Sequence, residues 1–431
     1  MEEEACSKME SLRFVHASQL RLDQPLSGLS EWQGVSRESL RDASLRGFAA
    51  VVDVCLSERV DLLLLTGDVW SADGSDYRAA VALQTGCQRL ADAGISVIIH
   101  VREQTTFHRG LCGVKLPESV ALLADLGVND WAWERAGTAA AIFRSVRSRQ
   151  HEGSGHPKGS VTSATQDAFK SLPRIGLLES PDCLYAGETS LSVVGGESLD
   201  PAVDYIADGC HLRQRTVRLG TNTIHCPGPA QGLSPHEAGP CGCTLVEWDG
   251  PGEVRLTTLP VAPLRWEQWH VELSGEDGSD QLLPAMLRTI SESTQDQAAC
   301  TWLVSWNLCD CDLPVDLWQT PEGQSALLRE LDRRARDRGV SLCSQGISLL
   351  STGSPLRIAD PVWDEFDRLL SENVEQRRDA VRLLASGMRF TDEAGRAAAA
   401  KCLNGLSPVR LAQEARVYGR NWLGTHEASD R

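Results

Sequence analysis

The feature that most constrains the fold is a run of four leucines, residues 62–65, followed by a Thr-Gly-Asp sequence that ends at Asp68. A short apolar run bounded by turn residues is typical of a strand covered on both faces of its sheet. The Gly-Asp pair turns the chain at the carboxyl end of that strand. Helical apolar patterns flank the run at residues 37–59 and 77–93. The chain is therefore expected to fold as an α/β protein whose helices cover a sheet.

Further segments extend this pattern and divide it into three regions. Additional strands are predicted at residues 12–18, 95–100, 174–178, 203–207, 243–248 and 254–259. After residue 266, strand-like and helix-like segments alternate in a smaller unit, and from residue 361 the pattern is mainly helical. We therefore predict three domains, at residues 12–266, 267–358 and 359–424.

The charge balance and the N-terminal segment bound the function and the location. The formal net charge of −17 disfavours unaided binding to a polyanion, unless basic side chains gather on one face or metal ions take part. The first ten residues are acidic and polar, unlike a signal peptide. No apolar run approaches the roughly 20 residues of a membrane span. We expect a cytoplasmic protein without a membrane partner.

The cysteines give little sign of a structural metal. Fourteen are scattered through the chain, and the only close pairs are Cys241 with Cys243 and Cys309 with Cys311. Because a C-x-C pair without a matched second pair is a weak zinc signal, ordinary reduced thiols are the preferred interpretation.

Six motifs occur in an order that is specific for one fold. They are FVHASQLRLDQPL (14–26), LTGDV (65–69), AGISVII (93–99), IGLLES (175–180), VDYIADGCHLR (203–213), and PGPAQG (227–232) followed by GCTLV (242–246). Together they resemble the SbcD-type DNA double-strand-break repair nucleases, and their YhaO-like branch in particular, within the calcineurin-like metallophosphoesterase superfamily. The resemblance covers residues 12–266.

This resemblance implies a fold and a set of partners. It implies a four-layer metallophosphoesterase sandwich, with two mixed sheets flanked by helices, then a small α/β capping domain and a helical C-terminus. By the same resemblance, the C-terminal helices dock an SbcC-like coiled-coil ATPase, and the apolar spacing over residues 361–384 fits such docking or packing within the chain. DNA and a second copy of the chain are further partners that the family implies.

The resemblance also implies a two-metal site, and most of its ligands are replaced. Two-metal hydrolysis needs Asp and His ligands at several strand ends, so that one cation activates water and both stabilise the developing charge. The bridging aspartate is kept as Asp68. Other side chains stand at the remaining family positions, namely Gln19, Arg21, Arg102, Glu103, Gln104, Glu179 and Cys210, with His211 displaced by one residue from a ligand position.

These replacements lead to expectations for individual side chains. We expect Arg21 or Arg102 to pair with Asp68 and Glu179, with the cationic side chain taking the place of the metal. Asp68 is also interpretable as a turn or helix-capping residue. His16 is interpreted as a core histidine. His211 is interpreted as an ordinary buried or rim histidine rather than as a metal ligand.

Three functions stay open at this point. The first is a catalytically inactive pseudonuclease that acts as a scaffold or regulatory subunit in a DNA-repair complex and needs no cofactor. The second is an active metal-dependent exonuclease or phosphoesterase, in which Mn²⁺ or another divalent ion is held by an unorthodox set of ligands. Those ligands are Asp68, Glu179, Cys210 and His211. The third is a module that reuses the pocket to bind something other than DNA.

Overall fold

The structure is a computed structural model of the chain. It describes residues 11–29, 40–71, 76–101, 103–124, 130–146, 172–178, 203–250, 253–272, 281–294, 300–309 and 321–350. The chain divides into two units, Met1–Leu350 and Ser351–Arg431, and every described residue belongs to the first. The helical segment predicted at residues 359–424 lies outside the described residues.

The first sheet is mixed and has six strands in the order β12-β11-β1-β2-β3-β4. Strands β1 to β4 run parallel, whereas β11 is antiparallel to both β1 and β12. The strands are β1 (Leu12–Ser18), β2 (Leu62–Thr66), β3 (Ser96–His100), β4 (Val120–Leu123), β11 (Cys243–Gly250) and β12 (Glu253–Leu259).

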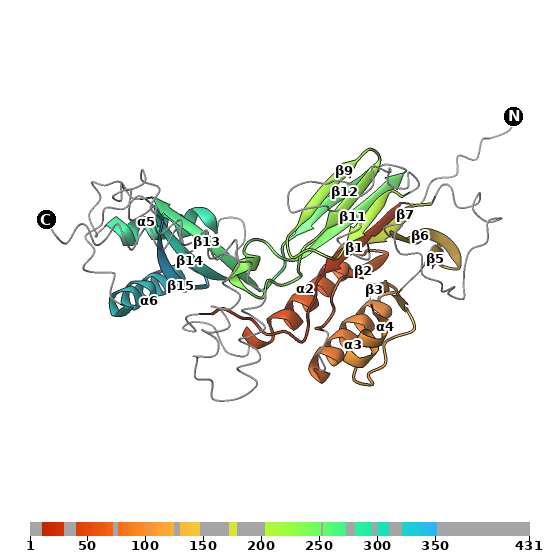
Figure 1. Ribbon diagram of the computed structural model, residues 1–431, viewed down its shortest axis with the longest axis horizontal. Helices are drawn as coiled ribbons and strands as arrows, with labels where there is room; N and C mark the ends of the chain where they lie inside the picture. The colour runs from red at the N-terminus through yellow and green to blue at the C-terminus, as the bar shows by residue number, and fades with distance from the viewer. Residues whose placement is uncertain are drawn as a thin grey trace, which may run out of the picture. The chain divides into compact units, whose positions relative to one another are not determined.

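Two helices make the first two parallel crossovers of this sheet, α2 (Ala43–Glu58) and α3 (Tyr77–Asp92). Helix α3 begins where the Asp76 side chain accepts the backbone N–H of Arg78. Its buried residues recur at helical spacing, so one apolar face packs on the sheet. Both helices lie along this sheet (Figure 1). A short helix, α4 (Gln104–Gly110), follows β3.

The second sheet is also mixed, with six strands in the order β5-β6-β7-β8-β10-β9. The four central strands run parallel, and the edge strands β5 and β9 are antiparallel to their neighbours. The strands are β5 (Trp131–Arg135), β6 (Thr138–Val146), β7 (Arg174–Leu178), β8 (Tyr205–Asp208), β9 (Arg215–Leu219) and β10 (Asn222–Cys226).

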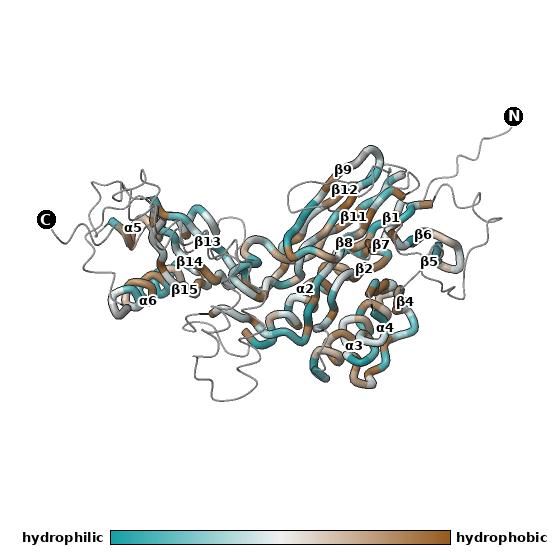
Figure 2. Tube along the Cα trace, in the orientation of Figure 1, coloured by the Kyte–Doolittle hydropathy of each residue, from teal (hydrophilic) through white to brown (hydrophobic). Residues whose placement is uncertain are grey.

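The two sheets face each other across an apolar core. Phe14, Leu62 and Leu64 of the first sheet pack there with Phe143 and Tyr205 of the second. The opposite face of the first sheet packs on α2 and α3, and Figure 2 shows hydrophobic colour along β2 and mixed colours along α3. The two predicted mixed sheets are confirmed. The helices predicted on the far face of the second sheet are not among the described elements, so the four-layer arrangement stays a prediction.

A third, parallel sheet follows, in the order β13-β14-β15. Its strands alternate with two helices around a core that contains Trp269, Trp302 and Trp306. The elements are β13 (Leu264–Glu272), α5 (Leu282–Ser293), β14 (Thr301–Cys309), α6 (Pro321–Asp337) and β15 (Leu342–Leu350). Strands and helices thus alternate in this unit, while the predicted domain boundaries and a capping role stay predictions. None of the described helices is both long and apolar enough to span a membrane.

Candidate functional site

The carboxyl ends of β2 and β8 touch where the two sheets approach each other. A Cβ atom on Gly67 would lie 2.3 Å from the carbonyl oxygen of Gly209, and one on Gly209 would lie 2.4 Å from the backbone nitrogen of Gly67. Gly67 also has a positive φ of 73°. Only glycine fits both positions, so the fold brings the Gly-Asp turn after β2 against the turn after β8.

Gln19 joins these strand ends from the end of β1. Its side chain is 6% exposed, and its Nε2 donates a hydrogen bond of 2.6 Å to the carbonyl oxygen of Gly209. Its backbone N–H donates to the carbonyl oxygen of Thr66 at 3.1 Å. Gln19 therefore ties the ends of β1, β2 and β8 together by hydrogen bonds, at a position where the family resemblance expects a metal ligand.

Arg21 is buried and paired with a residue that the sequence analysis did not identify. Its Nη1 and Nη2 donate to Oε1 and Oε2 of Glu237 at 3.0 and 2.5 Å. Glu237 closes the short 3₁₀ helix η3 (Pro235–Glu237) and also accepts the backbone N–H of Leu233 at 3.1 Å. The two side chains are 9% and 7% exposed. This is a buried, bidentate ion pair.

The prediction that Arg21 pairs with Asp68 is therefore wrong. The two residues meet instead through their backbones, in a hydrogen bond of 3.1 Å from the Arg21 N–H to the Asp68 carbonyl oxygen. Asp68 is exposed, and no described residue gives its carboxylate a hydrogen bond or an ion pair. Arg102 and Glu179, the other members of the predicted pairing, lie outside the described residues.

Two further predicted pocket residues lie at the exposed start of α4. The Glu103 carboxylate accepts the hydroxyls of Thr105 and Thr106 at 2.5 and 2.8 Å. These hydrogen bonds, led by the one from Thr105, lower the pKa of Glu103. Gln104 contacts His108, with Nε2 3.3 Å from the ring Nε2. Both residues thus bond within their own helical turn, and neither is hydrogen-bonded to Gln19 or Arg21.

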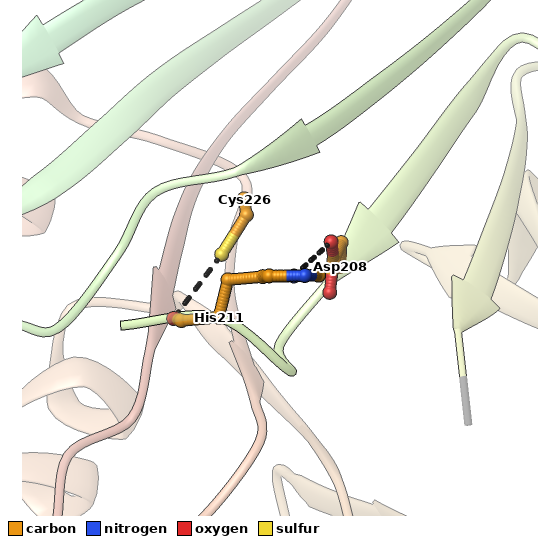
Figure 3. Close-up of side chains that lie close together, drawn as sticks. All are labelled: Asp208, His211 and Cys226. Atoms are coloured by element: carbon orange, nitrogen blue, oxygen red, sulfur yellow. Dashed lines mark hydrogen bonds and ion pairs between the residues drawn. The ribbon is translucent and has the colours of Figure 1, made fainter. Parts of the chain in front are cut away.

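A second group of polar side chains gathers at the ends of β8 and β10. The Nδ1 atom of His211 lies 2.9 Å from Oδ2 of Asp208, and the Cys226 thiol donates to the carbonyl oxygen of His211 at 3.5 Å. Figure 3 shows the three side chains converging. Asp208 and Cys226 are buried, and His211 is half-buried. Cys210, the other predicted ligand here, packs against apolar side chains of the second sheet, and its role as a ligand stays a prediction.

Two buried histidines also form hydrogen bonds that link the two sheets. His16 Nδ1 lies 2.7 Å from the Tyr205 hydroxyl, and its Nε2 lies 2.8 Å from the Thr66 hydroxyl. Both ring nitrogens are therefore partnered, as expected for a core histidine. His225 is bonded in the same way, to Thr216 and Thr244, both at 2.8 Å.

Burial controls the protonation of these two histidines. It lowers the pKa of His16 well below its usual value, and the neighbouring His225 lowers it further. It also lowers the pKa of His225 to about 4, although the Asp208 carboxylate opposes this shift. Desolvation disfavours the charged form of a histidine, so both rings are neutral at physiological pH.

The chain is similar to one protein whose name places it in the superfamily that the motifs indicate. No family model matches the chain. The chain is 29% identical over 297 residues to a protein of Bacillus subtilis (strain 168) named "Uncharacterized metallophosphoesterase YhaO", over 66% of this chain and 69% of that protein. Among solved structures, TT1561 of Thermus thermophilus aligns with 58% of this chain and 99% of its own, at 12% identity and a TM-score of 0.31.

Proposed function

We propose that this chain is an SbcD-like protein of the metallophosphoesterase superfamily that no longer hydrolyses phosphodiesters and acts as a scaffold or regulatory subunit beside an SbcC-like coiled-coil ATPase. The ordered motifs and the similarity to a metallophosphoesterase of Bacillus subtilis support the superfamily. The proposed loss of hydrolysis rests on the contacts of Gln19 and Arg21. These two residues stand at the first pair of ligand positions that the family resemblance implies.

The side chains at these positions do not fit a two-metal centre. A cation needs lone pairs from carboxylates, imidazoles or other acceptors, and Arg21 has none to give. Its guanidinium is paired with the Glu237 carboxylate, so this carboxylate is also not free to bind a cation. Gln19 uses its amide N–H as a donor to Gly209. Ion pairing and hydrogen bonding within the chain thus take up the side chains that would otherwise face metal ions.

Asp68 supports the competing proposal of residual activity. Its exposed carboxylate lacks a hydrogen bond or ion pair from any described residue, so it is free to bind a cation. With Glu179, Cys210 and His211 it would make the unorthodox site of an active metal-dependent exonuclease. An assay of hydrolysis separates the two proposals.

The test compares the wild-type chain with Asp68→Asn and with the double variant Q19D/R21H. Each protein is incubated with Mn²⁺ and either bis-p-nitrophenyl phosphate or linear duplex DNA. We expect no turnover by the wild type above that of Asp68→Asn. Turnover by the wild type that Asp68→Asn abolishes would establish the active alternative. Turnover gained only in Q19D/R21H would show directly that these two residues removed the activity.

The partner is tested separately with purified components. The full chain is mixed with the SbcC-like ATPase of the same organism, and the mixture is analysed by size-exclusion chromatography with light scattering. Co-elution as a complex supports the scaffold proposal. Separate elution of the two proteins, with no effect of the chain on ATPase activity, favours the third function, in which the pocket serves a role unrelated to DNA.

A further inference from the structure

Two adjacent parallel strands of the second sheet place donor side chains next to each other at their carboxyl ends. Strands β8 and β10 pair with Ala207 opposite His225, so Asp208 and Cys226 are the next pair along. Ile206 and Ile224, two residues earlier on the same strands, pack in one apolar cluster. Because side chains alternate between faces, Asp208 and Cys226 emerge on the same face as these isoleucines.

The turn after β8 brings a third donor to the same point. The Oδ1 atom of Asp208 accepts the backbone N–H of Cys210 at 2.8 Å, which tightens the turn. The turn places the His211 ring with Nδ1 2.9 Å from Oδ2 of Asp208. One donor atom each from Asp208, His211 and Cys226 lies within 4.8 Å of the other two. Figure 3 shows the three side chains together.

We propose that Asp208, His211 and Cys226 form a mononuclear site for a divalent transition metal, with Zn²⁺ the preferred ion. Zinc takes carboxylate oxygen, imidazole nitrogen and thiolate sulfur at about 2.0–2.3 Å, which puts donors around a tetrahedral ion about 3.3–3.8 Å apart. The present donor atoms lie within 4.8 Å of one another, so binding an ion requires them to approach each other by up to about 1.0–1.5 Å. A sulfur ligand selects against Mg²⁺ and Ca²⁺, which take oxygen.

This site is distinct from the family's two-metal centre. The family resemblance puts ligands of the β8 turn at Cys210 and Leu212, and neither belongs to the proposed group. Three protein ligands leave a fourth position of the ion open to water or another small ligand. His211 is the half-buried member, so access to the ion is from its side.

Two other interpretations use the same three residues. A Cys-His-Asp nucleophile would require the thiol to bond the imidazole, but the Cys226 thiol donates to the His211 backbone carbonyl. In a purely structural role, Asp208 holds the turn and a neutral or protonated His211 without any ion. The structural role predicts no metal binding, so it is tested by the same experiment.

The experiment titrates the full-length chain, stripped with EDTA, with Co²⁺ as a spectroscopic substitute for zinc. We expect one Co²⁺ per chain, with a thiolate-to-cobalt charge-transfer band in the near ultraviolet that Zn²⁺ removes by displacement. Cys226→Ser should abolish the band. His211→Gln, at a half-buried position, should weaken Zn²⁺ affinity by more than the about 10–100-fold typical of losing an outer-shell partner.

Cys210→Ser is the matched control, because this thiol is a neighbour in the same turn and should leave the band unchanged. The proposal is overturned if the wild type shows no band, if Cys226→Ser retains it, or if Cys210→Ser removes it. Far-ultraviolet circular dichroism identifies any variant that does not fold. If Cys226→Ser does not fold, the Zn²⁺ affinity of His211→Gln tests the proposal in its place. The assay of Mn²⁺-dependent hydrolysis tests only the proposed function, and its result does not change the interpretation of the Co²⁺ titration.

Discussion

At the scale of single residues, the loop after β1 is held in a costly backbone conformation. Gln19 and Arg21 have positive φ angles of 51° and 44°, and the left-handed region costs a non-glycine residue about 1–2 kcal/mol. Such conformations persist only where the surroundings impose them. Here the bonds from Gln19 to Gly209 and from Arg21 to Glu237 do so. The loop thus keeps its shape with hydrogen bonds and an ion pair.

Breaking the buried ion pair should destabilise the fold. Glu237→Gln keeps the shape of the side chain but leaves the buried Arg21 guanidinium without its counter-charge. Removing one partner of a buried pair costs about 3–5 kcal/mol, and we expect a loss of that order in the free energy of unfolding by urea. As a control, Arg255→Gln, which breaks exposed ion pairs, should change the free energy of unfolding by less than about 1 kcal/mol. Equal effects of the two substitutions would refute a special role for the buried pair.

The buried histidines should make stability depend on pH between about 4 and 6.5. The pKa of His225 falls to about 4 in the folded protein, against about 6.5 in an unfolded chain. The unfolded state therefore binds more protons in this window, and stability is lost as pH falls through it. His225 alone should account for about 2 kcal/mol between pH 7 and pH 5.

Urea unfolding of the wild type and of His225→Gln at these two pH values measures that contribution. The variant should lose less stability on acidification, while His16, whose pKa is also lowered, keeps part of the effect. An identical drop in both proteins would assign the pH dependence to other groups.

At the scale of elements, the sequence predicted strands and helices well where apolar periodicity is strong. The predicted strand at residues 12–18 coincides with β1, and the predicted helix at residues 77–93 exceeds α3 by one residue. Both elements face a core on a regular set of positions, so their own residues encode them.

The site was less predictable, because its contacts join distant segments. Arg21 pairs with Glu237, 216 positions away, in a Pro- and Gly-rich stretch without periodicity. Asp208 and Cys226 become neighbours only because β10 adds beside β8 in the sheet. Neither residue belongs to a spacing pattern that would mark it as a metal ligand. The choice of partner depends on sheet order, which local sequence does not encode.

The contact between the turns after β2 and β8 should be intolerant of a side chain. Gly67→Ala must accept a positive φ of 73° and a Cβ 2.3 Å from the Gly209 carbonyl oxygen. Gly137→Ala is the matched control, with a φ of 82° and no neighbouring atom within 4 Å. Both substitutions cost about 1–2 kcal/mol for the left-handed backbone, and Gly67→Ala should lose about 1–3 kcal/mol more from crowding. Equal urea midpoints for the two variants would show that the turns separate at little cost.

At the scale of the whole molecule, the distribution of charge limits contact with nucleic acid. The chain carries 59 acidic residues against 42 lysines and arginines. Two arginines of α6 are already balanced by carboxylates, because Arg333 pairs with Glu330 and Asp337, and Arg334 pairs with Glu330. Cations already paired with carboxylates neutralise fewer phosphates, so they release fewer counterions on binding DNA.

We therefore expect the chain alone to bind DNA weakly without metal. The test measures fluorescence anisotropy of a labelled duplex in EDTA at roughly 0.15 M ionic strength. The anisotropy should not saturate below about 10⁻⁵ M protein, a dissociation constant within or above the range of nonspecific binding. Adding the SbcC-like ATPase should be needed for tight binding if the scaffold proposal holds. Saturation well below about 10⁻⁶ M, with affinity that falls steeply as salt rises, would instead demonstrate a local basic groove on this acidic chain. Arg333→Gln would then test α6 directly, since loss of a phosphate contact reduces the salt slope by about one.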